Sequence, residues 1–211
     1  MNTASMNMMK SGNTHDMNGG HSAKDGMMSH GALEALIGKT KPTHVAVRSG
    51  KWSEASTWKN GRIPGNNANV LIEKGLTVTY DQVSDARLKT IANRGTLNFP
   101  PNQDTKLIVE TILNAPEGKF NVGSAGRAVA ADKTTEIIFT SDRGIDRQLD
   151  PTQLGKGLVS HGEVNIYGAD KLDKVALVGD ATAGNNVLKF NQAPTGWRVG
   201  DQVAFRVEHR A

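Results

Sequence analysis

The stretch Val70-Leu-Ile-Glu-Lys-Gly-Leu-Thr-Val-Thr-Tyr80 contains two short apolar runs joined by a glycine turn. Both runs are rich in β-branched residues, which favour strands over helices. Similar pairs recur along the 211-residue chain at intervals of roughly 20–25 residues, and no segment after residue 43 has a helical period over ten residues. The pattern therefore predicts an all-β body built from short, paired strands.

The other predicted strands share this composition and are separated by turns that contain glycine, proline or asparagine. In chain order they are 45–47, 87–91, 96–99, 106–109, 136–139, 163–167, 174–178, 186–190 and 202–205. Recurring strand pairs are typical of a parallel β-helix, in which each coil packs mainly on its neighbours. The scarcity of aromatic residues, 10 of 211, favours this fold. A β-sandwich gives a similar signal from one sequence and stays open as the alternative.

Composition excludes several classes of protein. The 25 Lys and Arg against 21 Asp and Glu give a net charge of +4, spread thinly, so the basic stripe of a nucleic-acid binder is absent. No apolar run approaches the roughly 20 residues of a membrane span, and the N-terminus lacks the apolar stretch of a secretory signal. The chain has no cysteine, which excludes disulfides and thiolate metal sites.

The first 30 residues differ in composition from the body. They contain all seven methionines and three of the six histidines, but no Leu, Ile, Val or aromatic residue. Such a segment buries too little apolar surface to offset its ordering entropy, so residues 1–30 are predicted to be disordered. Residues 31–43 are predicted to form a helix of at most two turns and a linker, followed by a β domain over residues 44–211.

The thioether and imidazole groups of this tail are candidate metal ligands. Thioether sulfur is a soft ligand that favours Cu(I), and imidazole suits Cu(II), Zn and Ni. The candidates are Met6, Met8, Met9, His15, Met17, His21, Met27, Met28 and His30. The composition resembles the Met/His-rich tails of bacterial proteins that handle copper or silver outside the cytoplasm. A low-complexity leader without a ligand is the alternative, and no other cofactor is expected.

A longer motif surrounds the strand pair quoted first. It begins Ser49-Gly-Lys-Trp-Ser-Glu-Ala-Ser-Thr-Trp58, continues with Gly61 and Pro64, and closes with Gly196-Trp-Arg-Val-Gly-Asp-Gln-Val203. Over about residues 45–205 the chain resembles the glycine-eight domain family, named for eight characteristic glycines. The candidate family glycines are Gly50, Gly61, Gly75, Gly95, Gly123, Gly162, Gly168 and Gly200.

The resemblance implies a right-handed parallel β-helix whose first coils are strand pairs. It also implies an extracytoplasmic setting, either periplasmic or secreted. The family includes vertebrate cell-surface proteins that bind and depolymerise hyaluronan, and bacterial secreted proteins. Members usually continue beyond the closing motif, so the resemblance implies that this domain continues into, or packs on, further β-helix coils.

Two groups on the body are candidates for catalysis. His161, in a His-Gly turn, is a candidate general base or sugar contact. Asp142 and Asp146, in the loop that also contains Asp150, are candidates for a carboxylate pair that cleaves a glycosidic bond. The structural alternatives are a histidine that hydrogen-bonds a neighbouring coil and a solvated loop whose acids and bases pair with each other.

Trp52 and Trp58 are candidates for a platform that stacks on sugar rings, and packing residues that seal the first coil are the alternative. The sequence favours an exported, non-catalytic module that binds polysaccharide or presents a surface within a larger extracellular protein. The first alternative is part of an enzyme, a hydrolase or lyase, that depolymerises an acidic, hyaluronan-like polysaccharide. The second is copper or silver binding by the tail. A mildly basic body suits an acidic glycan, and neither nucleic acid nor a membrane span is expected.

Overall fold

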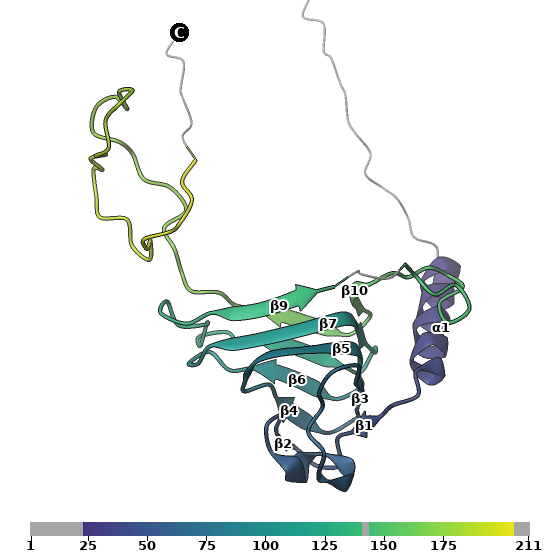
Figure 1. The fold of residues 1–211 in the computed structure, drawn as a ribbon. Helices are drawn as coiled ribbons and strands as arrows, with labels where there is room; N and C mark the ends of the chain where they lie inside the picture. Colours follow the sequence, from purple (N-terminus) through teal and green to yellow (C-terminus); the bar gives the residue numbers. More distant parts are fainter. Residues whose placement is uncertain (1–22, 141–143, 205–211) are drawn as a thin grey trace, which may run out of the picture.

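The computed structural model describes residues 23–140 and 144–204, with side chains from residue 31 onward. Its strands form two sheets, and every pairing between named strands is parallel (Figure 1). The first sheet contains β1 (His44–Val45), β3 (Asn69–Ile72), β5 (Val83–Asn93), β7 (Thr105–Asn114), β9 (Thr135–Phe139) and β10 (Gly157–Ser160). The second contains β2 (Gly50–Lys51), β4 (Thr77–Thr79), β6 (Thr96–Phe99), β8 (Lys119–Val122) and β11 (Glu163–Ile166). The prediction of an all-β fold is confirmed.

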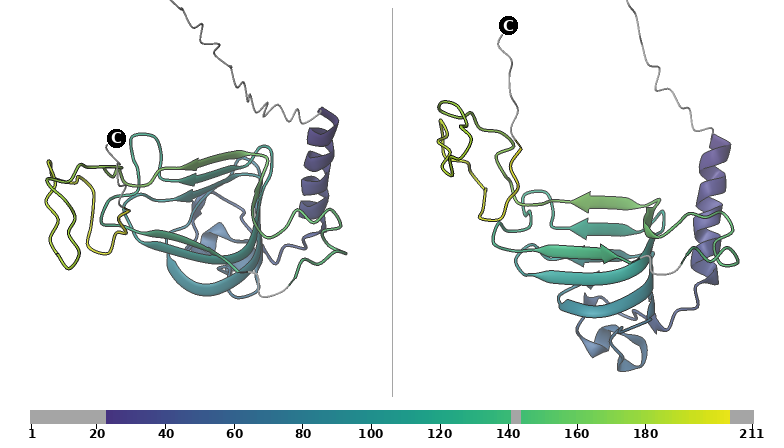
Figure 2. Two further views of the ribbon diagram at one scale, coloured as in Figure 1. Left: turned by 90° about the horizontal axis from the view of Figure 1, so that it is seen from above. Right: turned by 45° about the horizontal axis from the view of Figure 1, so that its top comes forward.

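The chain alternates between the two sheets. The strand orders are β1-β3-β5-β7-β10 and β11-β8-β6-β4-β2, so each strand pair lies on the pair that precedes it in the chain. We call each pair a coil (Figure 2). Two short 3-10 helices, Ala55–Thr57 and Lys59–Gly61, lie between the first two coils. Stacking of parallel pairs is the arrangement that the β-helix prediction requires, and its right-handed form stays a prediction.

One coil is interrupted. Along one edge β7 pairs with β5, and along the other it pairs with β9 through residues 105–109 and with β10 through residues 111–114. The segment that precedes β10, residues 144–156, leaves the stack and lies beside the helix (Figure 1). Strands β9, β10 and β11 form the last-coil end of the stack, and β1 and β2 form its first-coil end.

The core between the sheets contains a continuous line of aromatic rings. Trp58, Trp52, Tyr80, Phe99 and Phe120 contact one another in that order, with centroid separations of 4.8, 5.1, 5.3 and 5.6 Å. None of the five is more than 2% exposed. Each such pair contributes about 0.5–1.5 kcal/mol beyond its area burial, so the line of rings couples successive coils.

The helix α1 (Ala23–Lys39) is longer than the sequence predicted. It includes residues 23–30, which were assigned to the disordered tail, and it passes through Gly31 and Gly38. Ala23, Lys24, Met27 and Met28 in its first two turns are good helix formers, and the helix continues through Gly26 as well as the two later glycines. Residues 1–22 lie outside the described residues. Among the described residues, no helix has the length and apolarity needed to cross a membrane.

Helix α1 packs on the outer face of the first sheet. Leu33, Leu36 and Ile37 form a second core with Ala92 of β5 and Leu113 of β7, and all five side chains are buried. The spacing of the three helical residues places them on one face, as predicted. The helix therefore covers one part of the sheet and forms a wall beside the part that it leaves open.

An ion-pair cluster fixes α1 to the turns of the stack. Arg94, which follows β5, donates from Nη2 to Glu34 of α1 and from Nη1 to Glu117 at 3.0 Å. The hydrogen bonds to Glu34 raise the pKa of Arg94, although burial opposes this. Burial tends to raise the pKa of Glu117, but hydrogen bonds from its own backbone N–H and from Arg94 hold it below its usual value.

Close backbone approach explains the glycines in the turns between the two sheets. A Cβ atom at Gly118 would collide with the backbone oxygen of Asn93 and with the side chain of Asn114. A Cβ atom at Gly162 would collide with the backbone oxygens of Ala115 and Gly118. At these two positions the turns of successive coils therefore stack too closely for a side chain.

The segment after β11 differs from its prediction. Residues 174–178, 186–190 and 202–205 were expected to be strands, but as far as residue 204, where the description of this segment ends, it contains only an isolated antiparallel bridge between Leu177 and Phe190. Val178 and Val187 are each 60% exposed. The composition of the segments 174–178 and 186–190 favours strands, but no neighbouring sheet edge pairs with these segments in this structure.

Candidate functional site

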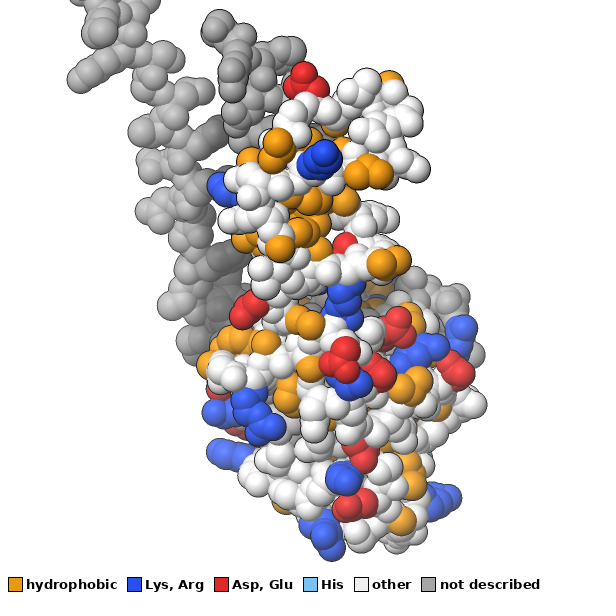
Figure 3. Space-filling view, turned by 90° about the vertical axis from the view of Figure 1, so that its left-hand side faces the viewer, with side chains coloured by type: hydrophobic (Ala, Val, Ile, Leu, Met, Phe, Trp, Pro, Cys, Tyr) orange, Lys and Arg blue, Asp and Glu red, His pale blue; other side chains and the backbone are white. Residues whose placement is uncertain are grey.

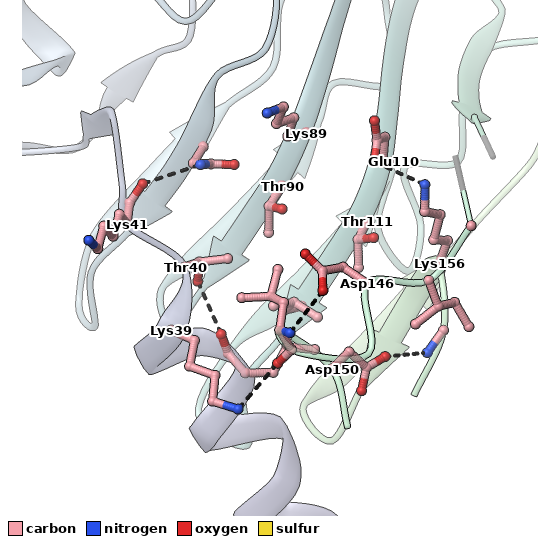
Figure 4. A pocket seen from close by; sticks show the side chains of 17 residues that line it. Lys39, Thr40, Lys41, Lys89, Thr90, Glu110, Thr111, Asp146, Asp150 and Lys156 are labelled. Carbon is pink, nitrogen blue, oxygen red and sulfur yellow. Dashed lines mark hydrogen bonds and ion pairs between the residues drawn. The ribbon is translucent and has the colours of Figure 1, made fainter. Parts of the chain in front are cut away.

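A cleft of about 400 Å³ lies on the outer face of the first sheet (Figure 4). One wall is the C-terminal end of α1, with Leu36 and Lys39, together with Thr40 directly after the helix. The other wall is the segment before β10, including Leu149 and Lys156. The cleft exists because α1 and this segment both rest on the sheet and leave a strip of strand surface between them.

The floor of the cleft is a row of short polar side chains. Asn69 of β3 aligns with Thr90 of β5, and Thr90 aligns with Thr111 of β7. Aligned residues on adjacent strands face the same side of a sheet and lie about 4.8 Å apart. The floor therefore presents an amide and two hydroxyl groups in a line across three coils.

Four lysines line the cleft, and they differ in their partners. Lys156 Nζ pairs with Glu110 at 3.1 Å, and Lys39 Nζ donates to the backbone oxygen of Leu149 at 3.4 Å. Among the described residues, the ammonium groups of Lys41 and Lys89 have no ion-pair or hydrogen-bond partner. Two unpaired cations beside a polar floor are suited to an anionic ligand with several hydroxyl groups.

The carboxylates of the segment before β10 accept hydrogen bonds from backbone N–H groups of the same segment. Asp146 Oδ1 accepts from the backbone N–H groups of Gln148 at 2.9 Å and Leu149 at 3.2 Å. Asp150, 6% exposed, accepts from the N–H groups of Leu154 at 3.1 Å and Gly155 at 3.0 Å. Both carboxylates therefore hold the shape of the cleft wall. Asp142 lies outside the described residues.

The other residues singled out from the sequence lie away from the cleft. His161 is half-buried in the turn between β10 and β11, where its backbone N–H donates to the Asn114 oxygen at 3.0 Å. Trp52 and Trp58 are 0% and 2% exposed, and Trp58 Nε1 donates to the Trp52 backbone oxygen at 2.7 Å. Stacking on sugars needs an exposed ring face, so the structure corrects the platform prediction: both rings pack inside the first coils.

The predicted metal ligands fall outside the side chains that the structure describes. Met6, Met8, Met9, His15, Met17 and His21 precede the described residues, and Met27, Met28 and His30 belong to the part of α1 described by its backbone alone. Among the described residues there is no group of three or more His, Asp or Glu side chains placed to hold a metal ion. The metal hypothesis therefore depends on the sequence alone.

Sequence reasoning missed the cleft residues. The cleft lysines, Lys41 and Lys89, and the floor residues are common residue types and form no sequence motif. Whether they lie close together depends on which strand positions align between coils. That alignment arises from coils that are 21 residues long at these positions, as between Asn69 and Thr90 and between Thr90 and Thr111. The only local signal was the alternation of outward polar and inward apolar side chains in each strand.

The fold and the cleft together define an all-β module of stacked parallel strand pairs, with a helix on one outer face. The family model of the G8 domain matches residues 57–178, more than half of the chain. The chain therefore belongs to the G8 domain family, and the resemblance seen in the sequence is confirmed. No significant match was found among curated proteins or among solved structures.

Proposed function

We propose that this G8 domain is an extracytoplasmic, non-catalytic module that binds an acidic polysaccharide in the cleft beside α1. The observation that carries the proposal is a pair of ammonium groups beside the polar floor, those of Lys41 and Lys89, which have no partner among the residues that the structure describes. Uronic acids carry the carboxylate and hydroxyl groups that such a surface recognises. The module is expected to pack on further β-helix coils of a larger extracellular protein.

The binding role is favoured over catalysis by the state of the carboxylates. A glycosidase of the usual kind needs two carboxyl groups directed at the scissile bond, one of them a proton donor. In the cleft Asp146 and Asp150 accept hydrogen bonds from backbone amides, and Glu110 pairs with Lys156. An enzyme that shortens a hyaluronan-like chain is the alternative reading.

Calorimetric titration with a hyaluronan hexasaccharide at low salt tests the proposal. The double variant Lys41→Ala/Lys89→Ala is expected to bind about 100-fold more weakly, since each lost charge-assisted hydrogen bond is worth about tenfold. The matched control is Lys51→Ala/Lys59→Ala, which removes two exposed lysines outside the cleft and should leave the affinity within about twofold.

Equal loss in the two double variants would contradict a site in the cleft. Equal binding of a neutral oligosaccharide of the same length would contradict recognition of an acidic glycan. Chain length after prolonged incubation separates the module from the enzyme, because shortening of the glycan supports the catalytic alternative.

The Met/His-rich tail supports a second candidate function, copper or silver binding, on the strength of its soft sulfur and imidazole donors. Cu(I) titration of the intact chain is compared with a variant in which Met6, Met8, Met9 and Met17 are changed to Leu. We expect the intact chain to bind more Cu(I), and equal stoichiometry would contradict a role for these sulfurs.

A further inference from the structure

The last-coil end of the stack leaves inward-facing side chains uncovered. Val164 and Ile166 of β11 align with Phe120 and Val122 of β8, which are buried. Yet Val164 is 39% exposed and Ile166 is 63% exposed. Among the described strands β11 pairs only with β8, so its other edge carries unpaired backbone groups. One further strand would satisfy both the backbone edge and the apolar row.

An amide ladder on the outer side of the same sheet also stops at β11. Asn121 Nδ2 donates to Asn98 Oδ1 at 2.9 Å, and Asn165 Nδ2 donates to Asn121 Oδ1 at 3.0 Å. Among the described residues no donor reaches Asn165 Oδ1. In each pair the Oδ1 atom of one coil accepts from the side chain of the next coil, so the expected partner of Asn165 Oδ1 is a donor side chain in a further coil.

The three strands of this ladder share a sequence pattern in which Asn lies between two apolar residues. The strands read Thr96-Leu-Asn-Phe99, Lys119-Phe-Asn-Val122 and Glu163-Val-Asn-Ile166. The segment Val187-Leu-Lys-Phe190 has the same alternation, with Lys in the place of Asn. An ammonium group is a donor without acceptor capacity, which is what the open Asn165 oxygen requires.

The position of this segment in the chain fits the next coil. Phe120 follows its aligned partner Leu97 by 23 positions, and Leu188 follows Val164 by 24 positions. The chain leaves β11 at the last-coil end, so the segment is within reach of the open edge (Figure 1). Register and reach therefore both match one further turn of the stack.

In the structure the segment is only weakly held. Val178 N–H donates to the Lys189 oxygen at 2.8 Å, Asn191 N–H donates to the Ala176 oxygen at 3.0 Å, and the Phe190 ring lies 5.6 Å from that of Trp197. An isolated two-stranded hairpin is marginally stable in water. Figure 3 shows the side of the molecule that lies on the left in Figure 1. Hydrophobic side chains gather over the upper part of this side, and many charged groups lie over its lower part.

We propose that Val187–Phe190 docks on the last-coil end as the next strand of the second sheet, parallel to β11. In the docked form Leu188 and Phe190 cover Val164 and Ile166, and Lys189 Nζ donates to Asn165 Oδ1. The hairpin is then the undocked form of the same segment. This inference goes beyond the glycan site and does not depend on it.

Disulfide trapping in the full chain tests the docking, because the chain has no cysteine of its own. The variant Glu163→Cys/Val187→Cys places two thiols at aligned outer positions of the docked strands, within the Cα range that a disulfide accepts. The control Glu163→Cys/Leu188→Cys is off register by one residue, so its second thiol faces the other side of the sheet. The variant Leu177→Cys/Phe190→Cys reports the hairpin.

We expect the aligned pair to close within one chain at least tenfold faster than the off-register control. Equal rates for these two variants, or closure of the hairpin pair alone, would overturn the proposal. Closure only between chains, seen as a dimer on a non-reducing gel, would overturn it in favour of a second copy as the occupant.

Hydrogen exchange of the unsubstituted chain gives a second test that does not depend on the variants folding. Exchange across residues 187–190 as slow as across β8 supports docking. Exchange as fast as in an exposed loop contradicts it.

Discussion

The middle coils and the last coil contain the same kinds of residue but bury them differently. Leu97 and Phe99, in a coil covered on both sides, are 0% and 1% exposed. In the last coil, Val164 aligns with the buried Phe120 and Phe139 aligns with the buried Val109. Yet Val164 is 39% exposed and Phe139 is 41% exposed. Burial in this fold is therefore a property of neighbouring coils and only secondarily of the residue itself.

The largest expected effect comes from removing a ring between two covered coils. Phe99→Ala should lower the free energy of unfolding by about 3–5 kcal/mol, because it leaves a cavity between Tyr80 and Phe120. Phe139→Ala should cost about 1–2 kcal/mol, because that ring is already partly hydrated. Urea denaturation followed by circular dichroism measures both, and equal losses would contradict the comparison.

A second prediction concerns the turns. Gly118→Ala should cost about 3 kcal/mol, because the added methyl group meets the backbone oxygen of Asn93. Gly168→Ala, just after β11, has nothing within 4 Å of the added methyl group and should change stability by less than about 0.5 kcal/mol. Thermal unfolding of the two variants and of the parent chain measures the difference. A large loss of stability in Gly168→Ala would contradict the explanation by backbone contact.

The amide side chains should show the same gradient. Asn114 is buried and donates to Ser160 Oγ at 2.9 Å while its Oδ1 accepts from Asn93 at 2.7 Å, so Asn114→Ala should cost about 2 kcal/mol. Asn165 donates to Asn121 Oδ1 at 3.0 Å, and in the undocked form its own Oδ1 accepts from no described residue, so Asn165→Ala should cost only about 0.5 kcal/mol while Val187–Phe190 stays undocked. Chemical denaturation with both variants tests this, and the reverse order would show that the last coil is already covered.

The smallest effect is a pH dependence at the helix. Because the folded pKa of Glu117 lies below its usual value, its contribution to stability is complete above about pH 4.3 and is lost as the pH falls through the folded pKa. Arg94→Met removes the ion-pair partner of Glu117. The stability that the chain loses between pH 6 and pH 3 should then be smaller by about 0.5–1 kcal/mol. Denaturation at pH 6, 4 and 3 measures it, and identical slopes in the two chains would show that Arg94 plays no part.

The sequence predicted those features that depend on local composition. The runs around Val70 and Val78 became β3 and β4, since β-branched residues beside a glycine turn favour a strand pair wherever a neighbouring strand is present. The same reasoning failed over residues 174–178, where the composition is similar but no sheet edge is paired. Local preference therefore predicts what a segment can form, and its neighbours decide whether it does.

The cleft could not be predicted because its residues meet only through the stacking. Asn69, Thr90 and Thr111 are about 21 positions apart and become neighbours only once the turn lengths have fixed the register. Trp52 and Trp58 were visible as a motif, but the motif does not show that Trp52 packs on Tyr80 of the next coil or that Trp58 packs on Trp52.

The order in which coils pair has a consequence for synthesis of the protein. Each coil through β8 pairs with the one made just before it, so a chain that emerges from its N-terminal end can add ordered layers one at a time. The exception is the layer shared by β9 and β10, where residues 140–156 must emerge before the second half of β7 gains its partner. Translation should therefore pass through a stage at which residues 111–114 of β7 are paired with β5 along one edge and still unpaired along the other.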